Sequence, residues 1–136
     1  SEKKKTNVIA LELPKGKIIT GKQTDLLSPA SSVIINAIKE LSKIPDEINL
    51  LSPTILEPIL KLRKNNNTLS LQEVLIALAV CSVTNPSIAS ALEKLEVLKD
   101  CEAHATYIVT NGDLKALKSL KINLTCEPNF YSKEIM

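Results

Sequence analysis

Alternating hydrophobic and polar positions near the N-terminus indicate two short β-strands joined by a tight turn. In the segment 7–13, Ile9, Leu11 and Leu13 fall on one face of an extended chain, and an extended pattern resumes at 17–20. Because the intervening residues include proline and glycine, which favour turns, the pattern predicts a β-hairpin or two adjacent strands. Three later segments also have the pattern of short strands: 47–51, 104–110 and 121–126.

Apolar residues recur at helical spacing between these strands, and each predicted helix begins at a capping residue. The capping signals are Ser28-Pro29, Ser52-Pro53, Ser70 with Glu73, Asn85-Pro86 and Asn111. Pro58 is expected to kink or break the second helix, because proline lacks the N–H that an interior helical position donates. The order of elements predicts an α/β fold: a single layered domain with a mixed, mostly parallel sheet, an N-terminal β-hairpin and about five helices.

The helix predicted over residues 71–83 is apolar on nearly every side. A helix without a polar face is either buried deeply or packed against another chain. The first reading makes this segment part of the core, and the second predicts a homo-oligomer.

The composition is that of a globular protein and argues against some classes of partner. The chain has 136 residues, of which 44% are hydrophobic, and a net charge of +2. So small a charge, with two tyrosines, one phenylalanine and no tryptophan, does not suggest nucleic-acid binding. No apolar run approaches the ~20 residues of a membrane span. The three cysteines lack Cys-x-x-Cys spacing, so we expect reduced thiols and a cytoplasmic location.

No repeat or linker divides the chain into separate units. We expect residues 7–136 to form one α/β domain, which resembles the C-terminal domain of a longer protein on grounds given below. Residues 1–6, which include the basic run Lys3-Lys4-Lys5, are expected to be a disordered tail or a cloning scar.

The first group of candidate functional residues follows the second strand and precedes the helix that begins at Ser28-Pro29. This group could bind an anion through free backbone N–H groups, the helix dipole and polar side chains. Its members are Thr20, Gly21, Lys22, Ser31, Ser32 and Asn36. The sequence is not a Walker motif, because the upstream glycine spacing is absent. The alternative is a turn with an exposed lysine.

The second group lies near the C-terminus and contains Glu102, His104 and Glu127, with Cys101 and Cys126 close by in sequence. Glu102 and His104 are two positions apart on a predicted strand, so they should face the same side and could perform acid–base catalysis. The spacing matches no established zinc pattern, and we assign no metal and no cofactor. The alternative is structural: His104 hydrogen-bonds a neighbouring carboxylate, and the cysteines are small core residues.

Seven stretches in one collinear order, from about Leu13 to Tyr131, carry a resemblance to a known family. They are Lys17-Ile18-Ile19-Thr20-Gly21-Lys22, the helix with Ser31, Ser32 and Asn36, Leu50-Leu51-Ser52-Pro53 with Glu57-Pro58, Glu73-Val74-Leu75-Ile76-Ala77-Leu78, Thr84-Asn85-Pro86, Cys101-Glu102-Ala103-His104 and Asn123-Leu124-Thr125-Cys126-Glu127-Pro128. Together they resemble the C-terminal region of an uncharacterised bacterial family, domain of unknown function 1846.

The resemblance implies an α/β fold, a cytoplasmic location and self-association, with a larger α/β region ahead of the matching portion. It implies no particular reaction. In the family pattern a histidine followed by threonine stands just before the capping-box helix, whereas this chain has Leu69-Ser70-Leu71 there. If that histidine is a ligand or a base in the family, this chain lacks it, and His104 is the one histidine that could take part in such a site.

Three hypotheses of different classes follow. The first is an assembly or regulatory C-terminal module of a larger cytoplasmic protein, which forms homo-oligomers or packs on a preceding domain of the same protein. The second is part of an enzyme or ligand-binding site for a small phosphorylated or carboxylated metabolite, which requires the two groups of residues to share a cleft. The third is a fragment of a metal-dependent hydrolase.

Overall fold

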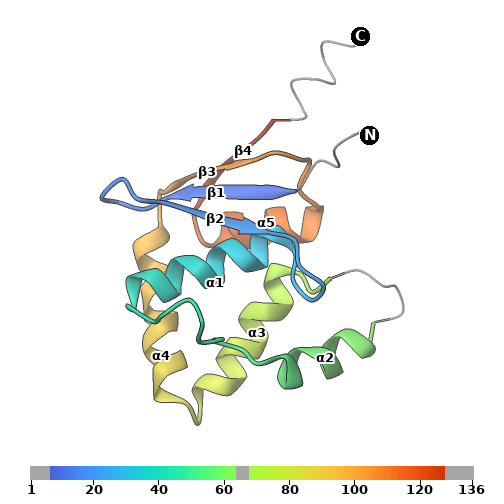
Figure 1. The fold of residues 1–136 in the computed structure, drawn as a ribbon. Helices are drawn as coiled ribbons and strands as arrows, with labels where there is room; N and C mark the ends of the chain where they lie inside the picture. The colour runs from blue at the N-terminus through green and yellow to red at the C-terminus, as the bar shows by residue number, and fades with distance from the viewer. Residues whose placement is uncertain (1–6, 64–67, 128–136) are drawn as a thin grey trace.

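A computed structural model describes residues 7–63 and 68–127 of the chain (Figure 1). The expected tail, residues 1–6, lies outside this part. The elements follow in the order β1 (Val8–Glu12), β2 (Ile18–Lys22), α1 (Pro29–Leu41), α2 (Pro53–Lys61), α3 (Leu71–Ser82), α4 (Pro86–Glu93), the 3-10 helix η1 (Lys94–Leu98), β3 (Glu102–Ala105), α5 (Asn111–Ser119) and β4 (Asn123–Cys126). This order confirms the α/β class, the N-terminal hairpin and the five helices.

The four strands form one mixed sheet in the order β2-β1-β3-β4. β1 is antiparallel to both β2 and β3, and only β3 and β4 run parallel, with α5 as the crossover between them. The sheet was expected to be mostly parallel, and that detail is wrong. The hairpin places an antiparallel pair at one edge, and β3 then joins β1 in the opposite direction.

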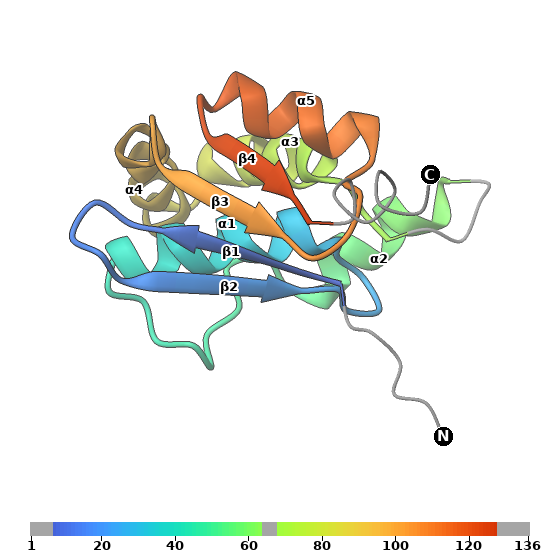
Figure 2. The same cartoon turned by 90° about the horizontal axis from the view of Figure 1, so that it is seen from above.

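All helices pack on one face of the sheet, and the described residues place none on the other (Figures 1 and 2). The buried face carries Ile9, Leu11 and Ile19, which belong to the core together with Ala103 and Ala105. Since strand residues alternate between faces, the intervening positions point to the uncovered face. A sheet with antiparallel pairs tolerates one solvated face, so this two-layer arrangement is stable without a second helical layer.

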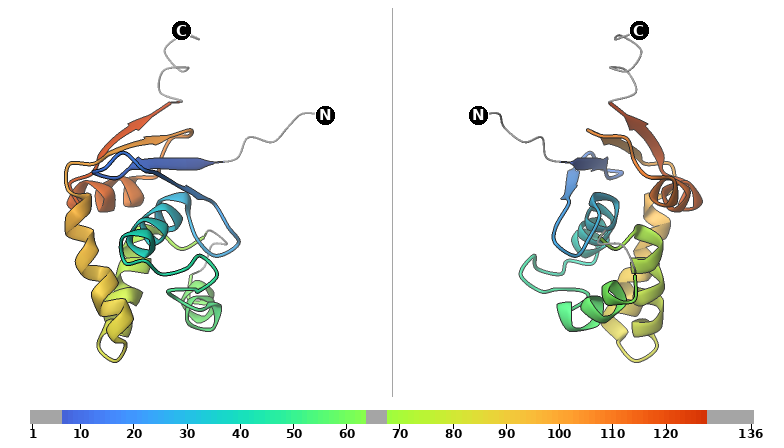
Figure 3. Two further views of the ribbon diagram at one scale, coloured as in Figure 1. Left: turned by 60° about the vertical axis from the view of Figure 1, so that its left-hand side comes forward. Right: turned by 90° about the vertical axis from the view of Figure 1, so that its right-hand side faces the viewer.

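Helix α1 lies at the centre of the helical layer (Figure 3). It contacts β1 and β2 on one side and α3 and α4 on the other, and most of its residues are buried. The approach to β2 is unusually close: a Cβ on Gly21 would lie 2.2 Å from the backbone nitrogen of Val33. A glycine is therefore required at this position for packing.

The predicted capping signals are confirmed at three helices. Ser28 accepts a hydrogen bond from the N–H of Ser31, and Ser70 and Glu73 form the complete capping box. Asn85 accepts from two backbone N–H groups of α4. Two details differ from expectation. The cap of α5 is Thr110 and not Asn111, and of the kink or break expected at Pro58 the break does not occur, because α2 runs through it. Because α2 buries only Leu56, the carbonyl that Pro58 leaves unpaired can be solvated.

The strand predicted at 47–51 is absent, and this segment is a loop. Leu50 and Leu51 are nevertheless buried, so the apolar run anchors a loop instead of a strand. At the outer edge of β2, the carbonyl of Thr20 accepts a hydrogen bond from the side chain of Asn36 and not from another strand. The strand predicted at 104–110 is also displaced, since β3 ends at Ala105, opposite Ile9 of β1.

Helix α3 is not deeply buried, contrary to the first reading of its apolar sequence. It buries Leu71, Val74, Ala77 and Leu78 against the core. Its opposite side exposes Ile76 by 57% and Val80 by 67%, and Val83 just after the helix by 81%. We call these three residues the α3 stripe. Within the described residues, no helix has the length and apolar character needed to cross a membrane.

Gly21→Ala should lower the free energy of unfolding by about 3 kcal/mol, because the added methyl group would overlap the backbone of α1. Gly112→Ala is the matched control: a Cβ there meets nothing within 4 Å, and α5 should tolerate or gain from alanine. Urea unfolding followed by circular dichroism measures both. Equal stability of the two variants would contradict the close contact.

Candidate functional site

The uncovered face of the sheet gathers the C-terminal group of candidate residues. His104 of β3 lies in register with Thr125 of β4 and with Ala10 of β1. The Nδ1 atom of His104 is 3.0 Å from the hydroxyl of Thr125, and Nε2 is 3.5 Å from a carboxylate oxygen of Glu127. The structure therefore brings His104 and Glu127 together, with the imidazole oriented through both nitrogens.

Glu102 faces the same side as His104, as the spacing predicts. Its carboxylate accepts a hydrogen bond of 3.2 Å from the amide of Asn123. Glu102, His104 and Thr125 line a shallow cavity of about 210 Å³. The side chains of His104 and Glu127 are 53% and 42% exposed, so water competes for their polar atoms. The pair could transfer a proton to a bound molecule, but this cavity offers little to hold one.

The two neighbouring cysteines do not join this group. Cys101 is buried, and its thiol donates to the carbonyl of Val97 at 3.6 Å. Burial raises the pKa of the Cys101 thiol, and the carboxylates of Asp100, Glu12 and Glu102 raise it further. A thiol that stays protonated is a poor nucleophile. Across residues 7–63 and 68–127, no three His, Cys, Asp or Glu side chains are placed to share a metal ion.

The predicted anion-binding group divides into two parts. Gly21 allows the close contact between β2 and the backbone of α1 at Val33. The hydroxyl of Ser31 donates to the carbonyl of Leu69 at 3.0 Å and lies 3.0 Å from the hydroxyl of Ser28. This contact ties the start of α1 to the start of α3, so Ser31 is engaged within the protein.

The remaining four residues, Thr20, Lys22, Ser32 and Asn36, line one cavity of about 390 Å³. We call it the edge cavity, because it lies between the outer edge of β2, one face of α1 and the loop that follows α1. Lys39 and Asp46 also line it. His104, Glu102 and Glu127 do not, so the two candidate groups occupy separate cavities. Lys22 and His104 sit on strands that β1 separates.

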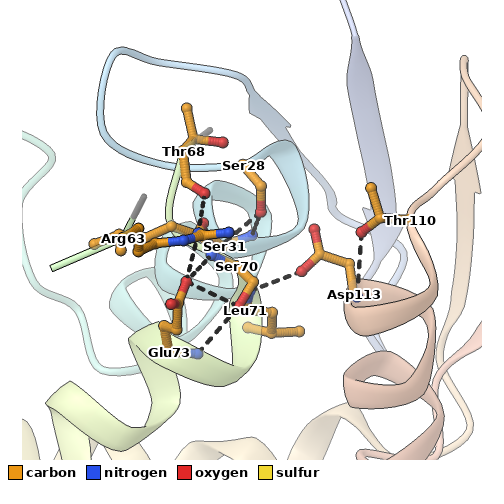
Figure 4. A network of polar contacts seen from close by, with 10 residues as sticks. Ser28, Ser31, Arg63, Thr68, Ser70, Leu71, Glu73, Thr110 and Asp113 are labelled. Carbon is orange, nitrogen blue, oxygen red and sulfur yellow. Dashed lines mark hydrogen bonds and ion pairs between the residues drawn. The ribbon is translucent and has the colours of Figure 1, made fainter. Parts of the chain in front are cut away.

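A third cavity, of about 760 Å³, lies where α1, α3 and α5 begin (Figure 4). The N-caps Ser28, Ser70 and Thr110 all line it. The protein supplies its own anions here. Glu73 accepts from Arg63 at 2.8 Å, and the buried carboxylate of Asp113 accepts from the N–H of Leu71 at 2.8 Å. These contacts compensate the partial positive charge of the helix ends.

Tyr107 lies in the same cavity. Burial raises the pKa of its hydroxyl well above the usual range, with smaller contributions from Asp113 and Cys126. The phenol therefore remains neutral at physiological pH and can act only as a hydrogen-bonding group here.

Sequence reasoning missed Lys39, Asp113 and Arg63. A signal existed for the first two. Lys39 follows Ser32 by seven residues, so both lie on one face of a mainly apolar helix, with Asn36 between them. Asp113 follows the cap Thr110 by three residues, a position where an acidic side chain is common. Arg63 has no such signal, because no periodicity or capping pattern links it to Thr68 and Glu73, although both are close in sequence.

Comparison with known proteins identifies relatives over nearly the whole chain. A family described as "Domain of unknown function DUF1846, C-terminal" matches residues 1–136. UPF0371 proteins are similar to this chain over 133 residues: 46% identical in Clostridioides difficile strain 630, 48% in Clostridium botulinum strain Eklund 17B and 42% in Clostridium tetani. Each match covers 94% of this chain and 26% of the relative. The chain thus spans about a quarter of the length of these relatives.

Asp113→Ala should lower the free energy of unfolding by about 2 kcal/mol, since it leaves the buried N–H of Leu71 without an acceptor. Asp113→Asn keeps a side-chain oxygen that can accept, so it should cost less. Chemical denaturation of both variants tests the contact. If the alanine variant is as stable as the asparagine variant, this hydrogen bond is not what holds α3 and α5 together.

Cys101 should react with iodoacetamide at pH 8 at least ~10-fold more slowly in the folded protein than in urea, because its sulfur is covered and its pKa is raised. Peptide mass spectrometry after timed labelling gives the rate at each cysteine. In the unfolded protein the three cysteines should react alike, which provides the control. Rapid labelling of Cys101 in the folded chain would show an accessible thiolate.

Proposed function

Because the chain belongs to the DUF1846 C-terminal family and spans about a quarter of its relatives, we propose that it is an assembly module of a larger protein. The α3 stripe is the observation that carries the proposal. Ile76, Val80 and Val83 follow one another at helical spacing, and all three are exposed. Scattered apolar residues are normal on a surface, but an aligned row on one helix marks a contact site.

The partner that we propose for the stripe is a second copy of the chain. A two-fold axis brings the same stripe of two molecules together, so each apolar residue meets an apolar residue. Antiparallel helices pack in this way when their ridges interdigitate. The low net charge of +2 opposes such pairing only weakly.

The contact in the isolated chain should be weak, because three exposed side chains on one helix bury less than the area of a stable interface. In a longer protein, the rest of the chain would add to this contact or bring two copies close together. The role that we infer for the domain is therefore to support assembly of the larger protein and not to assemble alone.

Light scattering after size exclusion, at loading concentrations from ~10 µM to ~1 mM, tests the proposal. The wild-type mass should rise with concentration, and Ile76→Glu should remain monomeric because it places a charge in the apolar contact. Ile18→Glu is a matched control, since Ile18 on β2 is 56% exposed and Ile76 is 57% exposed. This control should associate like the wild type.

A wild-type protein that stays monomeric over the whole range would exclude self-association through α3. Equal association of the wild type and both variants would place the contact elsewhere on the surface. If Ile76→Glu and Ile18→Glu both lost self-association to the same extent, the cause would be a general effect of the added negative charge.

A further inference from the structure

The edge cavity contains two buried polar groups, of which one has no hydrogen-bond partner among the described residues and the other has a single one. Ser32 is 7% exposed, and its hydroxyl has no hydrogen-bond partner among the described residues. Lys39 is 6% exposed, and the contact found for its ammonium group is the backbone carbonyl of Asp46 at 3.0 Å. Within the described residues, no carboxylate lies within ion-pair distance of it. Burying a hydroxyl and an ammonium without full partners is unfavourable, so both groups favour an anionic acceptor.

The edge of β2 adds backbone donors to the same cavity. Val8 directs its N–H and carbonyl to Thr106, beside β3, and therefore makes no backbone bonds with Lys22 opposite it. Thr20, two residues away, likewise directs its carbonyl to Asn36 and away from β1. In an antiparallel pair, the N–H and carbonyl of one residue point to the same side. The N–H groups of Thr20 and Lys22 thus point outward, along the edge that lines the cavity.

The charges of the lining define the ligand further. Lys22 and Lys39 contribute two positive charges, and Asp46 contributes one negative charge. One negative charge on a ligand balances this set, whereas a phosphate dianion would exceed it and meet Asp46. The rest of the wall combines the polar residues Thr24 and Asn49 with an apolar part formed by Leu27, Ile35, Leu50 and Leu51. The volume of about 390 Å³ is at the lower end of the range for small-molecule sites.

We propose that the edge cavity binds a small aliphatic monocarboxylate. The carboxylate accepts from the ammonium group of Lys39, and Ser32 donates to it after rotation about χ1. Lys22 begins on the uncovered face of β2, and its long side chain reaches the carboxylate around the edge of the strand. The aliphatic part packs on the leucine and isoleucine side chains of the wall. This binding function is separate from the assembly role, because it uses β2, α1 and the 46–51 loop, and none of the residues of the α3 stripe.

A titration of the ¹⁵N-labelled 136-residue chain with hexanoate, followed by amide NMR shifts, tests the proposal. Hexanoate should shift resonances within 20–22, 32–39 and 46–51 in a saturable manner. Hexanol has the same apolar body without the charge and should bind at least ~10-fold more weakly. Inorganic phosphate should also bind more weakly than hexanoate, because it has no apolar part and carries excess charge.

Two variants connect the binding to the named residues. Lys22→Met should weaken hexanoate binding about tenfold, and Ser32→Ala several-fold. Lys118→Met on α5 is the control, because this exposed lysine is on another element and should leave binding unchanged. Ser32→Ala should also leave the ligand-free protein at least as stable as the wild type, since the lost hydroxyl has no partner.

Several results would overturn the proposal. They are the absence of saturable shifts at ~20 mM hexanoate, shifts confined to other residues, and equal affinity of Lys22→Met, Ser32→Ala and the wild type. If hexanol bound as tightly as hexanoate, the carboxylate would not contribute to recognition. If phosphate bound more tightly than hexanoate, the cavity would not prefer a ligand with one negative charge. A mass measurement on the same samples keeps this test distinct from self-association through α3.

Discussion

The close contact between α1 and the N-terminal hairpin is the constraint on which the rest of the structure depends. Gly21 lets the backbone of α1 approach β2 at Val33, and no larger residue fits there. Helix α1 is then covered by strands on one side and by α3 and α4 on the other, so it forms the centre of the core. Because interiors are close-packed, a shift of α1 would disturb the sheet and the helical layer together.

This contact also determines where polar groups can collect. With every described helix on one face of the sheet, the polar strand residues lie on the other face, and His104 meets Thr125 and Glu127 there in the open. Where α1 passes the edge of β2, its polar positions Ser32 and Lys39 face the following loop instead of the core centre. The edge cavity is therefore a direct result of packing a helix with two buried polar residues against an edge strand.

Prediction from the sequence succeeded where the governing interactions are local. Ser28, Ser70 and Asn85 cap helices because the capping hydrogen bonds join residues within one turn. Glu102 and His104 share a face because strand side chains alternate. The failures were at segments whose state depends on distant partners. The run 47–51 has the composition of a strand but forms a loop that buries Leu50 and Leu51, and α2 is not broken at Pro58, because the carbonyl that the proline leaves unpaired can be solvated.

The sequence by itself determined the α/β class, the hairpin, the positions of the helices and the family, since these follow from periodicity, capping and collinear motifs. The tertiary structure alone decided the strand order, the direction of β3, which side of α3 remains exposed, and the division of the candidate residues between separate cavities. The physical reason is range. Helix capping and the alternation of strand side chains involve residues a few positions apart. Strand pairing and burial depend on contacts between segments that lie far apart in the chain.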